Sequence, residues 1–316
     1  MKGIKYIAQK LTSKALLRLR SKDFCPLIRT VNFSDFKPTE LKNVTFDFRH
    51  NTTHLGDRLF FLPLLCFLES KSINIRILDE SRSAQLLLSK LTGSQLPQAH
   101  ASAELISEDD SDLVVLPAPS FTTKLYLDKP IAIVDLTDHR TTLRVSDQLL
   151  ESFGNFLSLE SKTVDFQPFI SNQTAAVYDE KGKYFLFSNY VDSGRFRVTQ
   201  WSLDALAQHA KKLKESGFKI VHVGTQENAL EDNTKYDFID IDERGKTDIS
   251  GLIDLVRATN VEGCVSFDNF LMHLTGIHNK RAFIRFRGRF TQKARQHHFQ
   301  CVNTSFFSDS NPITYL

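Results

Sequence analysis

The sequence predicts an α/β protein made of two doubly wound halves, and three observations lead to that prediction. From residue 44 onward, short apolar runs alternate with segments of helical period, which is typical of a sheet covered by helices. Most of these runs lack polar alternation, as strands buried on both faces do. Residues 160–182, rich in Ser, Asn, Gln and Thr, interrupt the pattern, which then restarts.

The composition excludes several classes of protein. A chain of 316 residues and 36.1 kDa is consistent with two domains. Hydrophobic residues at 41% and charged residues at 24% exclude disordered, collagenous and multi-span membrane chains. The formal net charge of +3 gives no reason to expect a nucleic-acid partner. The cysteines are far apart without zinc spacing, and no apolar run is long enough to span a bilayer, so we expect a cytoplasmic protein.

The first half is expected to form a Rossmann-like domain over residues 44–165. Runs rich in Val, Ile, Leu and Phe predict strands, and apolar spacing of three and four predicts helices. The expected strands are 44–48, 73–78, 113–116 and 131–136, and the expected helices are 55–69 and 83–91.

The second half is expected to repeat this architecture over residues 183–300. Its expected strands are 184–188, 219–223, 238–241, 261–265 and 282–286, and its expected helices are 203–215, 249–259 and 271–277. Residues 1–43 are expected to form a basic N-terminal extension, and residues 301–316 a C-terminal tail. Two such sheets facing one another hold their ligand at the carboxyl ends of the strands.

Lysines and arginines dominate the first 24 residues, in which Asp23 is the only acid. On a helical projection Ile4, Ile7 and Leu11 share one face, so a basic amphipathic helix is expected. Two interpretations stay open. The helix adsorbs to an anionic membrane, on the inner face of the plasma membrane, where each basic side chain contributes about 1 kcal/mol. Alternatively, it packs on the domain with a solvated outer face.

Several common catalytic motifs are absent from the sequence. There is no Walker A loop, no GxGxxG, no HExxH and no GxSxG elbow. Asp109, Asp110 and Asp112 precede an expected strand and are predicted to form a solvated turn rather than a metal site. Two junctions between a strand and a helix remain as candidates.

The first junction runs from His50 to Arg58 and leads into an apolar helix. Gly56 allows close backbone approach by a ligand, and the Asp57 carboxylate can accept a proton. The alternative is that Asp57 caps the helix, where free amides and the macrodipole stabilise its charge. His54 can contact a ligand as well, although many loop histidines have no specific role.

The second junction covers residues 266–276, directly after the expected strand 261–265. A helix that begins here presents unsatisfied amides and the positive end of its dipole, which favours a diphosphate. Asp268 and Asn269 are plausible caps of that helix. His273 falls one turn inside it and either reaches a phosphate or sugar or lies in the core.

Taken together and in order, the two junctions resemble motifs of the heptosyltransferase family of lipopolysaccharide synthesis, glycosyltransferase family 9. Residues 56–65, Gly-Asp-Arg-Leu-Phe-Phe-Leu-Pro-Leu-Leu, look like the family's Gly-Asp and its apolar helix with a Leu-Pro. Residues 268–274, Asp-Asn-Phe-Leu-Met-His-Leu, are similar to its late motif Asp-Ser/Thr-Gly-x-x-His-Leu. Residues 191–201 look like its basic loop ending in Trp, and residues 219–224 like its next strand and terminal Gly. The resemblance covers about residues 44–290.

The resemblance implies a GT-B fold, in which two Rossmann-like doubly wound domains face a central cleft. It also implies an inverting transferase that needs no metal or cofactor and moves a sugar from a nucleotide-diphosphate donor to a bacterial cell-surface glycan. That acceptor is a lipopolysaccharide, a capsule or a lipid-linked precursor. The implied general base is Asp57. The implied donor-binding residues are Ser193, Arg195, Arg197, Gly224, Asp268, Asn269, Phe270, Leu271, His273 and Arg287. The implied acceptor-binding residues are His54, Gly56, Arg58, His139 and Arg140.

Two positions depart from the family pattern. Asn269-Phe270 stands in place of the small Ser/Thr-Gly pair, and Thr199 stands in place of a Lys before the Trp. Without Gly at this point the backbone cannot approach a diphosphate in the same geometry. Arg195 and Arg197 are expected to replace the lost Lys as bidentate phosphate binders. Two alternatives stay open: a nucleotide-sugar 2-epimerase, and a non-catalytic glycan-binding protein of the same architecture.

Overall fold

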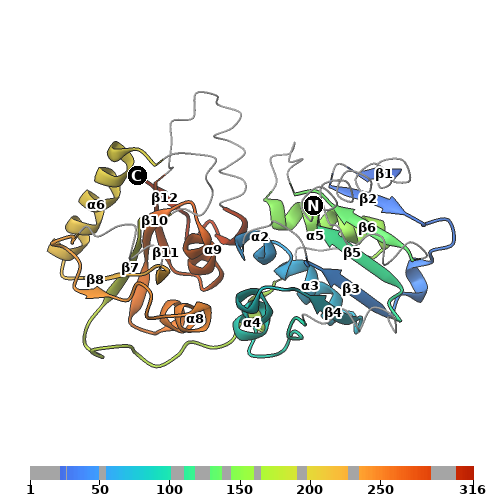
Figure 1. The fold of residues 1–316 in the computed structure, drawn as a ribbon, viewed down its shortest axis with the longest axis horizontal. Coiled ribbons are helices and arrows are strands. Elements are labelled where there is room, and N and C mark those ends of the chain that lie inside the picture. The colour runs from blue at the N-terminus through green and yellow to red at the C-terminus, as the bar shows by residue number, and fades with distance from the viewer. Residues whose placement is uncertain are drawn as a thin grey trace, which may run out of the picture. The chain divides into compact units, whose positions relative to one another are not determined.

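The computed structural model shows two compact units, Met1–Phe169 and Ile170–Leu316, each with its own six-stranded sheet (Figure 1). The boundary between the units falls inside the polar stretch 160–182. The structure describes residues 22–25, 27–49, 55–100, 110–117, 129–136, 144–159, 165–190, 198–226, 235–285 and 304–316.

The sheet of the first unit has the strand order β1-β2-β6-β5-β3-β4. Its strands are β1 (Lys22–Cys25), β2 (Ile28–Val31), β3 (Asn43–Asp47), β4 (Asn74–Leu78), β5 (Leu113–Pro117) and β6 (Ile131–Val134). The pairs among β3, β4, β5 and β6 are parallel, and β1 and β2 add an antiparallel edge. Its helices are α2 (Leu55–Leu59), α3 (Leu62–Ser70), α4 (Arg82–Leu91), α5 (Val145–Phe156) and the 3-10 turns η1 (Pro38–Glu40) and η4 (Gln167–Phe169).

The buried strands of the first unit follow the prediction. Every residue of β5 and β6 is buried, which agrees with their unbroken apolar sequences. The helix expected over residues 55–69 is divided into α2 and α3. Pro63 lies in the first turn of α3 and has no N–H to continue a helix from α2, so it begins a new one.

The basic N-terminal extension expected over residues 1–43 is shorter than predicted. Strands β1 and β2 lie within it, and β2 pairs with β6, with Ile28 opposite Val134. The reason is hydrophobic: Val31 belongs to a buried cluster that also contains Val114, Leu116, Ile131 and Ile133. The predicted basic amphipathic helix falls within residues 1–21 for nearly all of its length and lies outside the described residues.

The sheet of the second unit is entirely parallel, in the order β12-β11-β10-β7-β8-β9. Its strands are β7 (Tyr184–Ser188), β8 (Lys219–His222), β9 (Ile241–Asp242), β10 (Val261–Phe267), β11 (Arg281–Arg285) and β12 (Thr314–Tyr315). Its helices are α6 (Gln200–Glu215), α8 (Ile249–Arg257), α9 (Phe270–Ile277) and the 3-10 turn η5 (Thr304–Phe306).

The ends of this unit differ from the prediction in two places. In place of the strand expected over 238–241, the structure has the two-residue strand β9, which begins at Ile241. The Phe238 side chain packs into the core before this strand begins. The expected C-terminal tail contributes β12, whose Thr314 pairs with Phe283 of β11.

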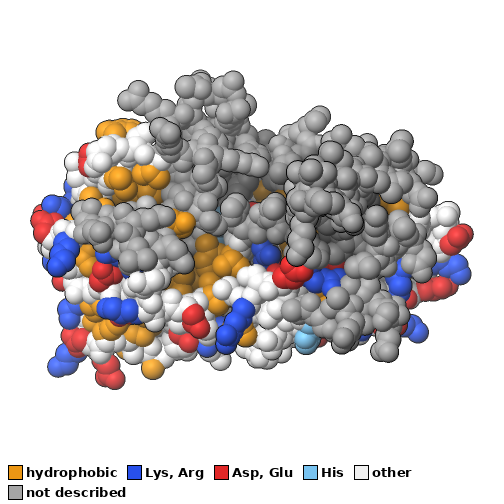
Figure 2. All heavy atoms as spheres, in the orientation of Figure 1, with side chains coloured by type: hydrophobic (Ala, Val, Ile, Leu, Met, Phe, Trp, Pro, Cys, Tyr) orange, Lys and Arg blue, Asp and Glu red, His pale blue; other side chains and the backbone are white. Residues whose placement is uncertain are grey.

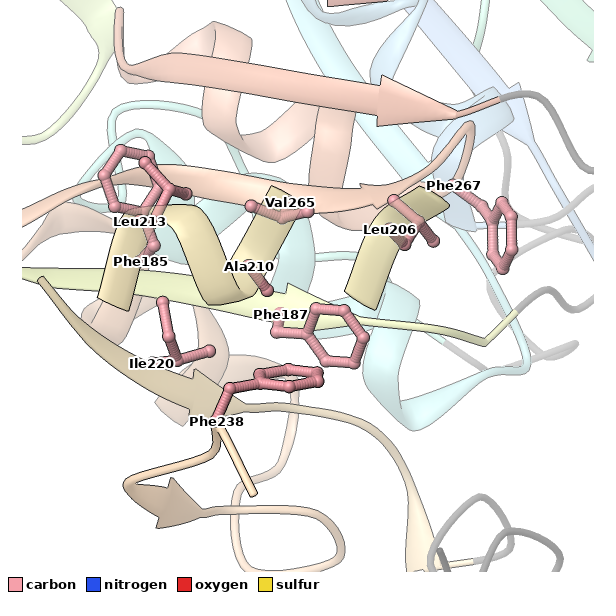
Figure 3. Packing of buried hydrophobic residues seen from close by; sticks show 9 residues of the cluster. All are labelled: Phe185, Phe187, Leu206, Ala210, Leu213, Ile220, Phe238, Val265 and Phe267. Carbon is pink, nitrogen blue, oxygen red and sulfur yellow. The ribbon is translucent and has the colours of Figure 1, made fainter. Parts of the chain in front are cut away.

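The core of the second unit lies between α6 and one face of the sheet (Figure 3). Leu206, Ala210 and Leu213 project from α6 at helical spacing. They meet a layer of side chains from the strands and from the turn before β9, namely Phe185, Phe187, Ile220, Phe238, Val265 and Phe267. Burial of each large apolar side chain contributes about 1.5–3 kcal/mol, so this layer fixes α6 on the sheet.

Gly263 of β10 marks a close approach between strands. A Cβ atom at this position would lie 2.0 Å from the Arg281 carbonyl oxygen and 3.0 Å from the Phe185 ring. The pairing with β7 shifts register between Val261 and Gly263. Only glycine lets the backbones approach this closely.

Charges are mixed over the described surface. On the face drawn in Figure 2, Lys and Arg side chains lie among Asp and Glu side chains. Surface ion pairs join Lys211 to Asp237 and Lys214 to Asp240. Asp112, expected in a solvated turn, accepts hydrogen bonds from the amides of Lys42 and Asn43 and so fixes the start of β3. Within the described residues, no helix has the length and apolar character needed to cross a membrane.

Candidate active site

Each sheet changes its winding direction at one point. In the first unit the chain passes from β3 to β4 on one side, and β5 lies on the other side of β3. In the second unit it passes from β7 to β8 on one side, and β10 lies on the other side of β7. In doubly wound sheets, ligands bind at the carboxyl ends of the strands that flank such a point. Both junctions named from the sequence follow one of these strands, β3 and β10.

The first junction leads from the end of β3 to α2. Gly56 and Asp57 are the second and third residues of α2, and both are half-buried. Asp57 lies within the first turn, where the helix dipole stabilises a carboxylate. A carboxylate is a group that can act as a general base toward a hydroxyl.

Arg58 has a different place from the one expected for an acceptor-binding residue. Its side chain is 7% exposed and forms an ion pair with Asp79, which is 3% exposed. Nε lies 2.5 Å from Asp79 Oδ2, and Nη2 lies 3.3 Å from Oδ1. The guanidinium also lies over the Phe48 ring, 5.7 Å from its centroid. A guanidinium buried in this way fixes α2 and is not exposed to an acceptor.

A second buried ion pair lies at the same sheet edge. Asp47, the last residue of β3, is fully buried and accepts hydrogen bonds from the amide, Nε and Nη2 of Arg49 at 2.8–3.0 Å. The ends of β3 and β4 therefore each carry a buried carboxylate paired with an arginine. Unpaired, either charge would be costly to bury.

The second junction leads from β10 to α9, with Asn269 as the N-cap. Its Oδ1 accepts from the Met272 amide at 3.4 Å, and its Nδ2 donates to the Tyr190 carbonyl at 3.0 Å and to Ser188 Oγ at 3.4 Å. The structure confirms the predicted cap. It also uses the side chain of Asn269, a predicted donor-binding residue, to hold α9 against the end of β7.

The residues around this cap differ in exposure. Asp268 is buried, Phe270 is half-buried and Leu271 is 3% exposed. The backbone at the start of α9 is therefore the part of this junction that can act as an anion site, because the dipole is positive there.

His273 lies in the core of the second unit, where its side chain is buried. Its ring packs edge-on against Phe306, with centroids 5.8 Å apart. Burial lowers its pKa to about 4, because the charged form is poorly solvated there. At neutral pH the ring is therefore neutral, and the structure places this predicted donor-binding residue in a buried position against Phe306.

A polar network lies at the carboxyl ends of β7 and β8, next to Gly224. His222 Nε2 lies 3.0 Å from Asn189 Oδ1, and Asn189 Nδ2 donates to the Tyr236 hydroxyl at 3.1 Å. Gly224 is half-buried and its carbonyl accepts from the Gly245 amide at 3.0 Å. Gly224 therefore shapes the turn after β8.

The remaining predicted site residues lie outside the described residues. They are His54, His139 and Arg140 on the acceptor side, and Ser193, Arg195, Arg197 and Arg287 on the donor side. In the described part of the chain, no three His, Cys, Asp or Glu side chains gather as a metal site would require.

Sequence reasoning missed two features of these sheet edges. Asp79 stands directly after the apolar run of β4, and a charged residue at such a point was a signal that could have been used. The network of Asn189, His222 and Tyr236 joins residues far apart in the sequence, so no local pattern indicated it.

Known proteins share the architecture of this chain, although their sequences differ greatly from it. No protein-family model matches the sequence, and no curated protein matches it. Among solved structures, a glycosyl transferase family 9 protein from Veillonella parvula superposes with a TM-score of 0.58 at 12% identity, covering 87% of this chain and 86% of its own. The E. coli heptosyltransferase WaaC with ADP gives 0.58 at 13% identity, covering 86% and 93%. The E. coli ADP-heptose lipopolysaccharide heptosyltransferase II gives 0.54 at 13%, covering 87% and 92%.

These likenesses extend over both units and over most of each protein's length. They agree with the two doubly wound sheets described above. The chain therefore has the GT-B fold found in those glycosyltransferases.

Proposed function

We propose that this chain is an inverting glycosyltransferase that transfers a sugar from a nucleotide-diphosphate donor to a glycan or glycolipid. The observation that carries the proposal is the position of Asp57. It lies in the first turn of α2, after the strand at the switch point of the first sheet, in a chain with the GT-B fold. Gly56 beside it has no side chain, which leaves room for a sugar ring of the acceptor.

In this mechanism the Asp57 carboxylate accepts the proton of the acceptor hydroxyl. The oxygen then attacks the anomeric carbon from the face opposite the diphosphate, so the bond to the diphosphate breaks as the new glycosidic bond forms, with inversion. A base of this kind contributes about a hundredfold to ten-thousandfold to the rate.

The donor diphosphate is assigned to the second unit. Backbone amides at the start of α9, near Asp268, Phe270 and Leu271, would stabilise the charge that develops on the leaving group. Arg195 and Arg197 would supply the fixed cations, with Ser193, Gly224 and Arg287 nearby in the donor site. Such stabilisation requires no metal ion. WaaC was solved with ADP, which supports a nucleotide diphosphate as the donor class.

The acceptor is assigned to the first unit. His54, His139 and Arg140 would contact a phosphorylated or acidic sugar of a bacterial cell-surface glycan. Location on the cytoplasmic face of the membrane, through the basic residues 1–24, would bring the enzyme to a lipid-linked acceptor.

The test begins with a screen of nucleotide sugars for thermal stabilisation, since a ligand at about 100 times its Kd adds about 2.7 kcal/mol. Transfer is then measured for wild type, Asp57→Asn, and a control, Asp35→Asn, at an exposed position in the same unit. We expect Asp57→Asn to bind donor as wild type does and to lose about a hundredfold or more in kcat. A wild-type rate in Asp57→Asn would remove Asp57 from the mechanism.

A further inference from the structure

We propose that the buried ion pair of Arg58 and Asp79 positions the Asp57 carboxylate for proton transfer. This inference rests on the proposed function, in which Asp57 is the general base. Arg58 and Asp79 are positioning residues, because they act through Asp57 and do not touch the substrate.

Helix α2 cannot hold its own orientation. It has five residues, Leu55–Leu59, and an isolated helix shorter than about 12 residues is marginal in water. Its stability must come from contacts with the rest of the unit. Two side chains of α2 are buried, those of Arg58 and Leu59.

Both the side chain and the backbone of Arg58 are held by neighbouring groups. Two nitrogens contact the two carboxylate oxygens of Asp79, at 2.5 and 3.3 Å. One face of the group lies over the Phe48 ring. The Arg58 carbonyl accepts from the Phe61 amide at 3.2 Å, where α2 leads into α3. A planar fork paired in this way permits little rotation.

Asp79 is held just as firmly from its own side. Its amide donates to the His100 carbonyl at 2.9 Å, and its Oδ1 accepts from the Ser81 amide at 2.9 Å. Its carbonyl accepts from Gln85 Nε2 at 2.9 Å. Ser81 is in turn the N-cap of α4. The carboxylate is thus fixed to β4 and α4 before it meets Arg58.

The consequence for Asp57 follows from helix geometry. Successive residues of an α-helix differ by about 100° around the axis, so fixing the direction of Arg58 fixes that of Asp57. A hydrophobic residue at position 58 would bury as well but would not set the rotation, and a buried ion pair brings little net stability compared with apolar packing. Geometry is therefore the property that this pair supplies.

The test is the double variant Arg58→Met/Asp79→Asn. It removes both charges together, which avoids an unpaired buried charge, and Asn keeps the Oδ1 acceptor for the Ser81 amide. We expect kcat to fall about a hundredfold at unchanged KM for the donor, since a misplacement of about 1 Å has that effect. The pH profile of kcat should shift, and amide hydrogen exchange in residues 55–59 should be faster. The single variant Arg58→Lys, which keeps the positive charge beside an intact Asp79, should have a higher kcat than the double variant.

The matched control is Asp47→Asn/Arg49→Met, which neutralises an equally buried pair at the same sheet edge. Because both charges are removed together, the melting temperature should change little, and kcat should stay within about threefold of wild type. Wild-type kcat in a folded Arg58→Met/Asp79→Asn protein would overturn the inference and leave the proposed function in place. A fall in kcat without faster exchange in residues 55–59 would also overturn it. A wild-type chain that transfers no sugar would overturn the proposed function first.

Discussion

Acidification should destabilise the second unit through His273. The side chain projects from α9 into the core against Phe306, and burial lowers its pKa from 6.5 to about 4. The unfolded chain therefore takes up a proton at higher pH than the folded chain does. The contribution of the neutral His273 ring to the free energy of unfolding is therefore complete above about pH 6.5. It is lost as the pH falls from there toward 4.

The size of the effect follows from the same values. A difference of one pKa unit corresponds to about 1.36 kcal/mol, so the total for His273 is about 3 kcal/mol below pH 4. At pH 5 about 2 kcal/mol of it is already lost. His278 acts in the same direction, because burial and the nearby Arg257 and Lys280 lower its pKa to about 3.

Urea unfolding at pH 7.5 and pH 5 measures this loss. Trp201 is the only tryptophan and lies in the second unit, so its fluorescence reports that unit. In His273→Phe, which keeps an aromatic ring against Phe306, the loss between the two pH values should be smaller by about 2 kcal/mol. His100→Phe, at an exposed position of the first unit, is the control. An equal loss in His273→Phe and wild type would refute the reasoning.

Three further predictions concern the second unit. Asn269→Ala removes the cap of α9 and should lower the unfolding free energy by about 1 kcal/mol in denaturant titration, whereas an unchanged midpoint would show that the cap is dispensable. Gly263→Ala places a Cβ 2.0 Å from a carbonyl oxygen and should cost about 3 kcal/mol in thermal unfolding, while a wild-type melting temperature would contradict this close approach. Arg195→Ala should weaken nucleotide-diphosphate binding by about 1.5–3 kcal/mol, with or without chelator, and calorimetry showing equal affinity would exclude Arg195 from the donor site.

The sequence predicted the buried parallel strands well, because their apolar runs are local signals. The strand Tyr184–Ser188 has the predicted bounds, and the helix over 271–277 differs by one residue. Long-range pairing was harder to predict. Ile28 and Val31 lie in a stretch without clear alternation, and they become strand residues where β2 pairs with β1 and β6.

The candidate site was predictable in place more than in detail. The sequence located the two junctions, after β3 and after β10, in which Asp57 and Asn269 lie. This was possible because ligands bind in the loops that follow buried parallel strands in such sheets. The partner of Arg58 was not, since Asp79 is 21 positions away and their pairing depends on how β4 lies beside β3. His273 shows the same limit, because exposure and burial on a short helix depend on what covers it.

The pairing of β2 with β6 bears on the order in which the chain becomes ordered during synthesis. Ile28 reaches its partner Val134 only after more than a hundred further residues have left the ribosome. Contacts this distant along the chain form late and slowly, because a long loop must close first. Until then, the apolar side chains of β2 are exposed to other nascent chains and chaperones. A ribosome-bound fragment that stops before residue 131 should therefore aggregate more readily than one that ends at residue 169, where the first unit is complete.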